Sequence, residues 1–255
     1  MKKLINYFIL AIFILAGFTG CKKNEDDPVS PYDAGKLKTE KFTNGSYTTT
    51  YTYTYNEHGK VQKRIEQTND HTQWVNFTVT GNKLAIDFVD DDGVALTDSC
   101  ILDSAGFITS QIRLLQGVSP LACEFEYDQD GYFTYLFQDW DQVSNTYSDY
   151  YFWRENEQGN AIEQYSSWPH EIFVYDEAYQ ANGICQVTIS AQTGFTEFSG
   201  YYGKLNKNLL KYIITNQDTS KYEYTFDEKG RATYQKITHT NYPTYERYFT
   251  YYPDH

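Results

Sequence analysis

The stretch Tyr222-Glu223-Tyr224-Thr225-Phe226-Asp227-Glu228-Lys229-Gly230-Arg231 decides the fold of this chain. Its first five residues alternate aromatic side chains with polar ones, which predicts a β-strand that buries one face. The residues from Asp227 to Gly230 predict a tight turn. The aspartate side chain can accept hydrogen bonds from nearby backbone amides, and the glycine can adopt a positive φ. A strand that ends in such a turn is half of a β-hairpin.

The same signature, an Asp or Asn three residues before a glycine, recurs along the chain. It predicts structural turns at Gly59, Gly93, Gly106, Gly131, Gly159 and Gly230. A wider series of glycines, at intervals of 20 to 28 residues, marks one end of the predicted hairpins: Gly59, Gly81, Gly106, Gly131, Gly159, Gly183, Gly203 and Gly230. Further turn residues lie midway between these glycines. Counting the runs between turns predicts about 16–18 strands.

The series of predicted strands indicates an all-β fold. The hairpin repeats are expected to form a single meandering antiparallel sheet. The best helical candidate, residues 207–214, ends in β-branched residues and is predicted to be another strand. The apolar face of such a sheet must be covered. The sheet can curl with this face inward, fold into two stacked layers, or turn the face outward into lipid. We expect one sheet curled into a barrel-like shape.

A barrel that spans the membrane is the least favoured of these closures. The apolar face is rich in tyrosine, and Lys63 is expected to share a strand face with Val61 and Ile65. A lysine that faces lipid near the middle of the bilayer costs about 2–4 kcal/mol. Lysine at that position therefore argues against a lipid-facing wall.

The first 35 residues are expected to lie outside the folded domain. Residues 1–20 have two lysines and a short apolar run, which are typical of a signal peptide. The Phe18-Thr19-Gly20-Cys21 sequence resembles the lipobox of bacterial lipoproteins, which implies lipidation of Cys21. Residues 21–35 predict an acidic, flexible tether, and residues 36–255 a single domain. The start of the tether resembles the lysine-plus-acidic export signal of Bacteroidetes surface lipoproteins, which implies an outer-membrane location facing the cell exterior.

Charge and cysteine content exclude several classes of protein. The net charge is −13, and no basic stripe is available to neutralise phosphates, so nucleic acid is not an expected partner. The expected membrane contact is the lipid anchor alone. Three cysteines follow Cys21, an odd number that excludes a framework of paired disulfides. Cys100 and Cys123 are predicted to lie two strands apart, too far to bridge. These two and Cys185 are predicted to be buried as small apolar residues.

The C-terminal part of the chain carries a specific resemblance. The run from Lys207 through the Tyr222–Arg231 turn to Tyr252 resembles a family of Bacteroidales lipoproteins of unknown function with a porin-like β fold. The earlier repeats more weakly resemble tyrosine-aspartate repeats of bacterial surface proteins. Cys100-Ile101-Leu102 departs from the pattern where aromatic residues are expected. The resemblance implies a fold and a location, and no activity.

No catalytic residue, metal site or cofactor is predicted. The five histidines are scattered without the spacing of metal ligands, and no nucleophile elbow, phosphate loop or zinc-protease motif occurs. The Asp90-Asp91-Asp92-Gly93 run has the oxygen-rich character that suits calcium. It lacks the spacing of a complete site, and a charged hairpin tip explains it as well.

Tryptophans are the candidate ligand-binding residues, because flat amphipathic rings stack on ligands such as sugars. The candidate ligand contacts are Trp140, Trp153 and Trp168. The alternative is that these tryptophans are structural and pair with aromatic residues of adjacent strands. Asp103-Ser104-Ala105 resembles an O-glycosylation sequon of Bacteroidetes secreted proteins, which implies a possible modification of Ser104. The expected function is non-enzymatic binding or scaffolding at the cell surface, with a glycan or a surface protein as partner. The alternative is a glycan or peptide hydrolase that uses a pair of carboxylates.

Overall fold

The computed structural model describes residues 35–90, 93–113, 121–131, 133–139, 149–155, 161–165, 171–180, 200–203 and 208–254. The chain divides into two units, Met1–Ser30 and Pro31–His255, and all described residues belong to the second. The predicted signal peptide and Cys21 therefore lie outside the described residues, as does the tether up to residue 34.

The described residues form an all-β fold of sixteen strands, as the sequence predicts. In chain order the strands are β1 (Leu37–Asn44), β2 (Tyr47–Tyr55), β3 (Val61–Gln67), β4 (Thr72–Thr80), β5 (Lys83–Asp90), β6 (Gly93–Leu102), β7 (Ile108–Arg113), β8 (Leu121–Tyr127), β9 (Phe133–Asp139), β10 (Asp149–Glu155), β11 (Ala161–Tyr165), β12 (Glu171–Gln180), β13 (Asn208–Ile214), β14 (Thr219–Phe226), β15 (Ala232–His239) and β16 (Tyr245–Tyr251). Strand β13 covers the segment that was the best helical candidate. Its β-branched end explains why it is a strand.

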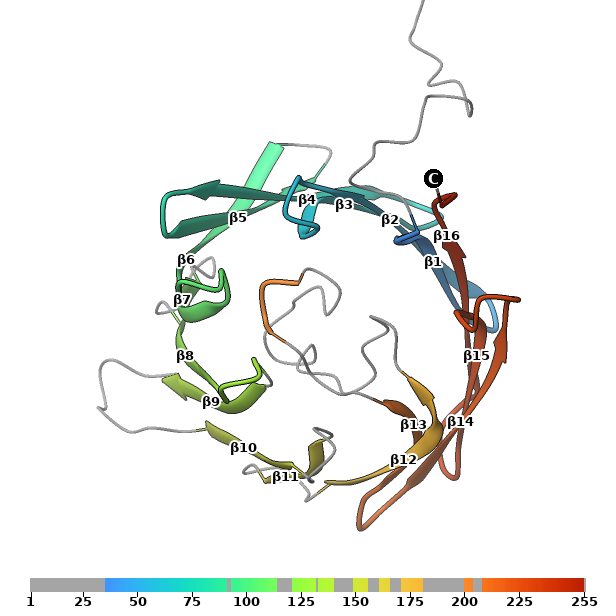
Figure 1. The fold of residues 1–255 in the computed structure, drawn as a ribbon. Helices are drawn as coiled ribbons and strands as arrows, with labels where there is room; N and C mark the ends of the chain where they lie inside the picture. The colour runs from blue at the N-terminus through green and yellow to red at the C-terminus, as the bar shows by residue number, and fades with distance from the viewer. Residues whose placement is uncertain are drawn as a thin grey trace, which may run out of the picture. The chain divides into compact units, whose positions relative to one another are not determined.

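Every strand pairs antiparallel with its sequence neighbours, and β16 pairs with β1. The meandering sheet therefore closes into a barrel, seen as a ring in Figure 1. In the closing pair, Glu40 lies opposite Phe249 and Phe42 lies opposite Arg247. The predicted curling of one sheet is confirmed. Full closure leaves no exposed edge among the paired strands.

The aromatic and aliphatic side chains point into the barrel. In β2, Tyr53 and Tyr55 are buried, and their threonine neighbours occupy the opposite face. In β8, Cys123 and Phe125 are buried, whereas Glu124 between them is exposed. This period of two is the pattern that the sequence predicts for a strand with one buried face.

The outer wall is polar over the strands whose side chains the structure describes. In β14, Lys221 and Glu223 form an ion pair of 2.8 Å, and each side chain is 49% exposed. The outer positions of the neighbouring strands carry mainly threonine, glutamate and lysine. Among the exposed large apolar side chains of the described residues, Ile172 and Ile214 lie opposite each other on β12 and β13, and the others are scattered singly. Exposed apolar residues that are scattered singly are normal on a protein surface in water.

The expectation that Lys63 shares a face with Val61 is wrong. Between β2 and β3 the register shifts, so that Tyr55 lies opposite Val61 while Thr54 lies opposite Lys63. The extra residue at this bulge turns Val61 into the barrel, where it is fully buried. Lys63 belongs to the outer face with Ile65, and its ammonium group lies 5.8 Å from the centre of the Trp74 ring.

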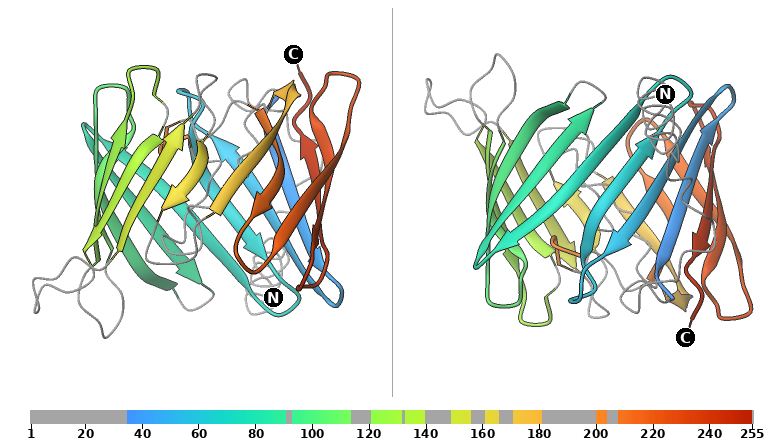
Figure 2. Two further views of the ribbon diagram at one scale, coloured as in Figure 1. Left: turned by 90° about the horizontal axis from the view of Figure 1, so that it is seen from below. Right: turned by 90° about the horizontal axis from the view of Figure 1, so that it is seen from above.

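One rim of the barrel, here called the glycine rim, carries the turns of the opening signature (Figure 2). Its turns contain Gly59, Gly81, Gly106, Gly131 and Gly230, with φ between 62° and 81°. In the β14–β15 turn, the Gly230 amide donates to the Asp227 carbonyl oxygen at 3.0 Å, and Asp227 Oδ1 accepts the Arg231 amide at 2.9 Å. Gly93, with φ of 122°, follows the turn at the opposite rim. Gly159 lies outside the described residues.

Both ends of the barrel's chain lie at the glycine rim. Strand β1 begins there and β16 ends there, and the Gly35 amide donates to the Pro253 carbonyl oxygen at 3.3 Å. The Tyr252 amide also donates to the Lys36 carbonyl oxygen at 2.9 Å. The described chain therefore begins and ends at the same rim.

Residues Gly200–Gly203, here called the lumen segment, lie inside the ring of strands (Figure 1). Tyr201 stacks on Phe77 at 5.6 Å between ring centres, and Tyr202 contacts Phe125 at 5.5 Å. Both tyrosines are buried. The prediction of a hairpin turn at Gly203 is therefore wrong. A sixteen-stranded barrel is too wide for its wall side chains to fill the interior, and the connection between β12 and β13 contributes rings that pack there.

Candidate functional site

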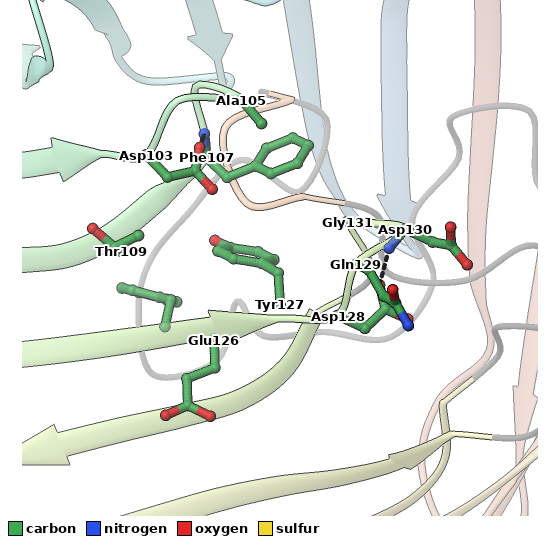
Figure 3. Close-up of a pocket in the computed structure, with 11 residues that line it drawn as sticks. Asp103, Ala105, Phe107, Thr109, Glu126, Tyr127, Asp128, Gln129, Asp130 and Gly131 are labelled. Carbon is green, nitrogen blue, oxygen red and sulfur yellow. Dashed lines mark hydrogen bonds between the residues drawn. The ribbon is translucent and has the colours of Figure 1, made fainter.

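A groove of about 590 Å³ opens at the glycine rim between the β6–β7 and β8–β9 hairpins (Figure 3). It follows from the strand register. Strands β7 and β8 pair from Arg113–Leu121 to Ser110–Glu124, whereas β8 stays paired with β9 as far as Tyr127. Beyond the last pair, β7 and β8 separate and leave the groove. Its lining residues are Asp103, Ala105, Phe107, Thr109, Phe125, Glu126, Tyr127, Asp128, Gln129, Asp130 and Gly131.

Three aromatic residues line the groove, Phe107, Phe125 and Tyr127. The Phe107 and Tyr127 rings lie 5.3 Å apart, and the Tyr127 hydroxyl donates to the Ile108 carbonyl oxygen at 2.7 Å. Burial raises the pKa of the Tyr127 hydroxyl far above its usual value, so the group remains a donor at neutral pH. Glycines allow this close packing. A β-carbon on Gly131 would lie 2.9 Å from the Phe107 ring, and one on Gly203 would lie 2.6 Å from the Tyr127 ring.

Carboxylates surround these rings. Asp103 and Asp128 begin the two hairpin turns, where their Oδ1 atoms accept the amides of Phe107 at 2.8 Å and Asp130 at 2.9 Å. Glu126 is exposed on β8. No lysine or arginine is among the residues that line the groove in the described part of the chain. The groove is therefore acidic and aromatic, a combination that suits a polar or cationic ligand.

A buried carboxylate lies deeper in the barrel. Asp98 is fully buried, accepts a hydrogen bond from Gln111 Nε2 at 2.9 Å, and lies 3.9 Å from Arg113 Nε. The Tyr202 hydroxyl of the lumen segment contacts Gln111 Oε1 at 3.3 Å. Burial raises the pKa of Asp98 from 3.8 to about 6, against the opposing effect of Arg113. Asp98 thus links the wall to the lumen segment through Gln111.

This raised pKa predicts a pH dependence of stability. Between pH 3.8 and about 6 the folded chain binds more protons at Asp98 than the unfolded chain does. The free energy of unfolding should therefore fall as the pH rises through this window. Asp98→Asn should remove this component of the pH dependence, and denaturant unfolding of both proteins at several pH values would measure it. An unchanged profile in Asp98→Asn would contradict the assignment.

A second buried polar network joins the first and last strands. Arg247 of β16 donates through Nε to Glu40 Oε1 of β1 at 2.5 Å, and through Nη1 to Gln235 Oε1 at 3.3 Å. The Tyr53 hydroxyl donates to the other oxygen of Glu40 at 3.2 Å. Each of the two most buried carboxylates of the described residues, Glu40 and Asp98, thus has an arginine near it. This arrangement differs from the pair of carboxylates that glycoside hydrolysis requires.

A serine, a histidine and an aspartate meet at the rim opposite the glycine rim. Ser220 Oγ lies 2.8 Å from His239 Nδ1, and Asp218 Oδ2 lies 3.2 Å from the same nitrogen. A Ser-His-Asp triad needs the serine and the aspartate on different ring nitrogens, so that the histidine can accept a proton from one while the other orients it. Here both contact Nδ1, which gives a structural network. Asp218 Oδ1 also accepts the Thr240 and Asn241 amides, which hold the β15–β16 loop.

The sequence-predicted site residues are only partly among the described residues. Cys21, Trp140 and Trp168 lie outside them. Trp153 lies in β10 opposite Gln164, and its side chain is not among those described. Ser104 is exposed on the β6–β7 turn beside the groove. The described residues contain no cluster of three or more metal-ligating side chains, and among them no helix has the length and apolar character needed to cross a membrane.

The prediction that Cys100 and Cys123 are buried, unpaired and two strands apart is confirmed. Both are free and 2% exposed, and each lies opposite Gln111, which occupies the strand between them. Burial is the main cause that raises the pKa of each thiol, that of Cys123 to about 12. Both thiols therefore stay protonated at neutral pH and are poor nucleophiles. Cys185 lies outside the described residues.

The chain has the fold of an all-β barrel whose interior is packed with side chains and with part of its own chain. A scan against models of known protein families finds no match, and a search of curated protein sequences finds none either. Solved structures do match. A porin-like protein from Bacteroides uniformis ATCC 8492 aligns with a TM-score of 0.69 and 13% identity, covering 88% of this chain and 99% of that one. A porin-like protein from Bacteroides vulgatus ATCC 8482 aligns with a TM-score of 0.58 and 13% identity, covering 86% and 99%. The likeness shows the fold, and it agrees with the porin-like β fold that the sequence resemblance implies.

Proposed function

We propose that this protein is a surface-tethered outer-membrane lipoprotein with a non-enzymatic binding or scaffolding role. The observation that supports the proposal is the orientation of the barrel wall, with charged side chains on its outer face and mainly aromatic and aliphatic side chains on its inner face. A barrel that spans a bilayer has an apolar outer band, and a lysine or arginine at the midplane costs about 2–4 kcal/mol. Charged pairs such as Lys221–Glu223 stand on the outer wall of this barrel. A wall of this kind suits a water-facing barrel that a lipid holds at the membrane.

The packed interior supports binding at the surface in preference to transport through the barrel. Tyr201 and Tyr202 fill part of the lumen, and the groove beside them is the place where a ligand can reach aromatic rings from outside. A glycan or a surface protein remains the proposed partner, with Trp140, Trp153 and Trp168 as the further candidate contacts. No carboxylate pair among the described residues favours the hydrolase alternative.

Changing Cys21 to alanine tests the anchoring. Wild type should incorporate a fatty-acid label and sediment with membranes. Cys21→Ala should lose the label, and the protein should either leave the membrane fraction or remain unprocessed. The barrel without its signal peptide should stay in the aqueous phase without detergent, because its outer wall is polar. The fatty-acid label measures lipidation. Extraction of membranes at alkaline pH, followed by detergent phase partition, measures how the protein is held at the membrane and whether the barrel stays in the aqueous phase. Wild type that carries no label would refute the lipid anchor, and a purified barrel that is soluble only in detergent would refute the water-facing wall.

A further inference from the structure

The lumen segment is held on the barrel wall by hydrogen bonds at both of its tyrosines. The Ile108 amide of β7 donates to the Tyr201 carbonyl oxygen at 2.8 Å. The Tyr201 hydroxyl accepts a hydrogen bond from Asn56 Nδ2 at 3.3 Å, and the Tyr202 hydroxyl donates to Gln111 Oε1 at 3.3 Å. The Ile108 amide is therefore a direct reporter of whether the segment is docked on the wall.

Gln111 joins Tyr202 to the buried carboxylate of Asp98. Its side-chain amide accepts from Tyr202 through Oε1 and donates through Nε2 to Asp98 Oδ2 at 2.9 Å. The other carboxylate oxygen, Oδ1, is buried without a hydrogen-bond partner among the described residues. A charged carboxylate that is cut off from water is costly, whereas a protonated one costs less. The docked segment therefore favours the neutral form of Asp98.

The charged and titratable groups of the described residues that face Asp98 come from three strands and from the lumen segment. They are Arg113 on β7, Cys100 on β6, Cys123 on β8 and Tyr202. On β5, the apolar Ile86 lies opposite Asp98. The arginine stays charged, and burial raises the pKa values of both thiols and of the tyrosine hydroxyl. In this cluster of described side chains, Asp98 is therefore the group that titrates between mildly acidic and neutral pH.

We propose that Asp98 is a proton-sensitive latch for the lumen segment. Loss of its proton leaves a buried charge that water stabilises better than the docked segment does. The equilibrium then moves toward a state in which Tyr202 leaves Gln111 and water reaches the carboxylate. Because the docked state binds more protons at Asp98 than the undocked state, a rise in pH favours undocking. The segment is thus held most firmly at mildly acidic pH.

Undocking would change the groove as well. Gly203, the last residue of the lumen segment, lies close to Tyr127 and Gly131, and both of these residues line the groove. Proton binding at Asp98 would therefore regulate the surface that the groove presents to a ligand. The inference concerns the folded barrel alone, and it does not depend on the proposed lipid anchor or on the proposed partner.

The test is hydrogen exchange of backbone amides in the purified protein at about pH 5 and about pH 7, with each rate divided by its intrinsic rate at that pH. The protection of the Ile108 amide should fall about tenfold between these two values, because the pKa of Asp98 is about 6 when the segment is docked and returns toward 3.8 when water reaches it. The Asp103 amide, which donates to the Phe107 carbonyl oxygen at 2.8 Å in the same hairpin, is the internal reference. Protection of Ile108 that stays constant, or that falls equally at Asp103 through opening of the hairpin or the whole barrel, would overturn the proposal.

Two variants separate the proton from the hydrogen-bond link. Asp98→Asn should remove the pH dependence of Ile108 protection, because asparagine can accept the hydrogen bond of Gln111 but cannot ionise. Tyr202→Phe keeps the ring and removes the hydroxyl, so Ile108 should lose protection severalfold at both pH values. Thermal melting of each variant would show that the barrel remains folded. A pH dependence that persists in folded Asp98→Asn, or unchanged protection in Tyr202→Phe, would overturn the latch.

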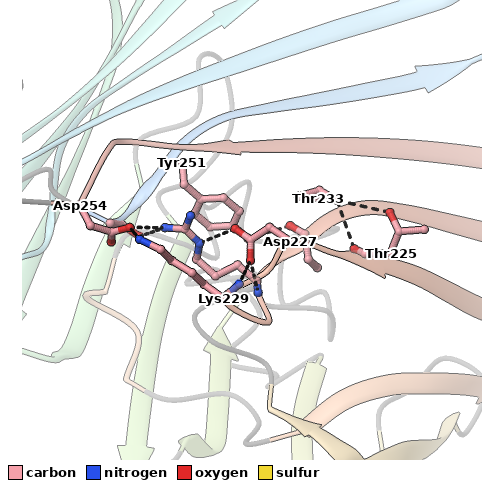
Figure 4. A network of polar contacts seen from close by, with 9 residues as sticks. Thr225, Asp227, Lys229, Thr233, Tyr251 and Asp254 are labelled. Carbon is pink, nitrogen blue, oxygen red and sulfur yellow. Dashed lines mark hydrogen bonds and ion pairs between the residues drawn. The ribbon is translucent and has the colours of Figure 1, made fainter.

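The control is Asp227→Asn, which removes the charge of another aspartate that lies beside an arginine (Figure 4). Asp227 accepts hydrogen bonds from the Lys229 and Arg231 amides and from Arg231 Nε, all within its own turn. Asparagine keeps such a turn intact, since Asn56 accepts the amides of the β2–β3 turn in the same way. The protection of Ile108 and its pH dependence should match those of wild type. An equal effect of Asp227→Asn and Asp98→Asn on Ile108 would show a general effect of charge and overturn the latch.

Discussion

Arg247→Leu is expected to destabilise the barrel by about 3–5 kcal/mol, because it leaves a buried carboxylate without its partner. The Arg247 guanidinium contacts Glu40 at 2.5 Å, and the Glu40 residue is only 4% exposed. The two residues belong to the strands that close the barrel, so the same change weakens the β1–β16 seam. Denaturant unfolding of the purified protein would measure the loss.

The double variant Glu40→Leu/Arg247→Leu serves as the control. When both partners are replaced by apolar residues of similar size, no uncompensated charge remains, and the cost should be smaller than that of Arg247→Leu alone. The difference gives the coupling between the two side chains. If the double variant lost as much stability as the sum of the two single variants, the network would not hold the seam as described.

Gly203→Ala is expected to destabilise the protein by more than about 3 kcal/mol, since it combines backbone strain with a steric clash. Gly203 has a φ of 69°, and an added β-carbon would lie 2.6 Å from the Tyr127 ring and 2.8 Å from the Gly131 carbonyl oxygen. A backbone oxygen cannot turn away as a flexible side chain can. The substitution should therefore displace the lumen segment from the wall.

Gly230→Ala isolates the strain from the clash. Gly230 has nearly the same backbone conformation, with φ of 74°, but an added β-carbon would meet no atom within 4 Å. Its expected cost is about 1–2 kcal/mol, the penalty for an L residue in the left-handed region. Thermal melting of both variants is the measurement. Equal losses at the two glycines would show that the lumen segment does not pack closely on Tyr127.

The local pattern of the sequence was sufficient to predict the wall of the barrel. Alternation such as Tyr222-Glu223-Tyr224 specifies which face is buried, and the Asp227–Gly230 signature specifies where the strand reverses. The alternation and the turn signature each depend on neighbouring residues alone, so both can be recognised without knowing which strands pair. The register shift opposite Tyr55 escaped prediction, because the bulge there depends on how β2 and β3 pair and not on either strand alone.

The groove and the lumen segment could not be predicted from the same signals. Gly203 has the spacing of a turn glycine, yet its positive φ serves the packing of Tyr201 and Tyr202 inside the barrel. The groove exists because β7 and β8 stop pairing at Ser110–Glu124. Trp140, Trp153 and Trp168 were predicted from ring chemistry and from their neighbours in the sequence, which do not specify where a ring lies in the folded barrel.

The pairing of β1 with β16 has a kinetic consequence. Thr39 and Thr250 contact each other at 2.7 Å although they are 211 residues apart in the chain. Joining such distant segments requires a large loss of chain entropy before the new contacts compensate for it, and folds that depend on distant contacts form slowly. Until β16 arrives, β1 and β15 each present an unpaired edge that could pair with another molecule. Closure is therefore expected to be a late step in folding, and the interval before it is when the chain is most prone to aggregate.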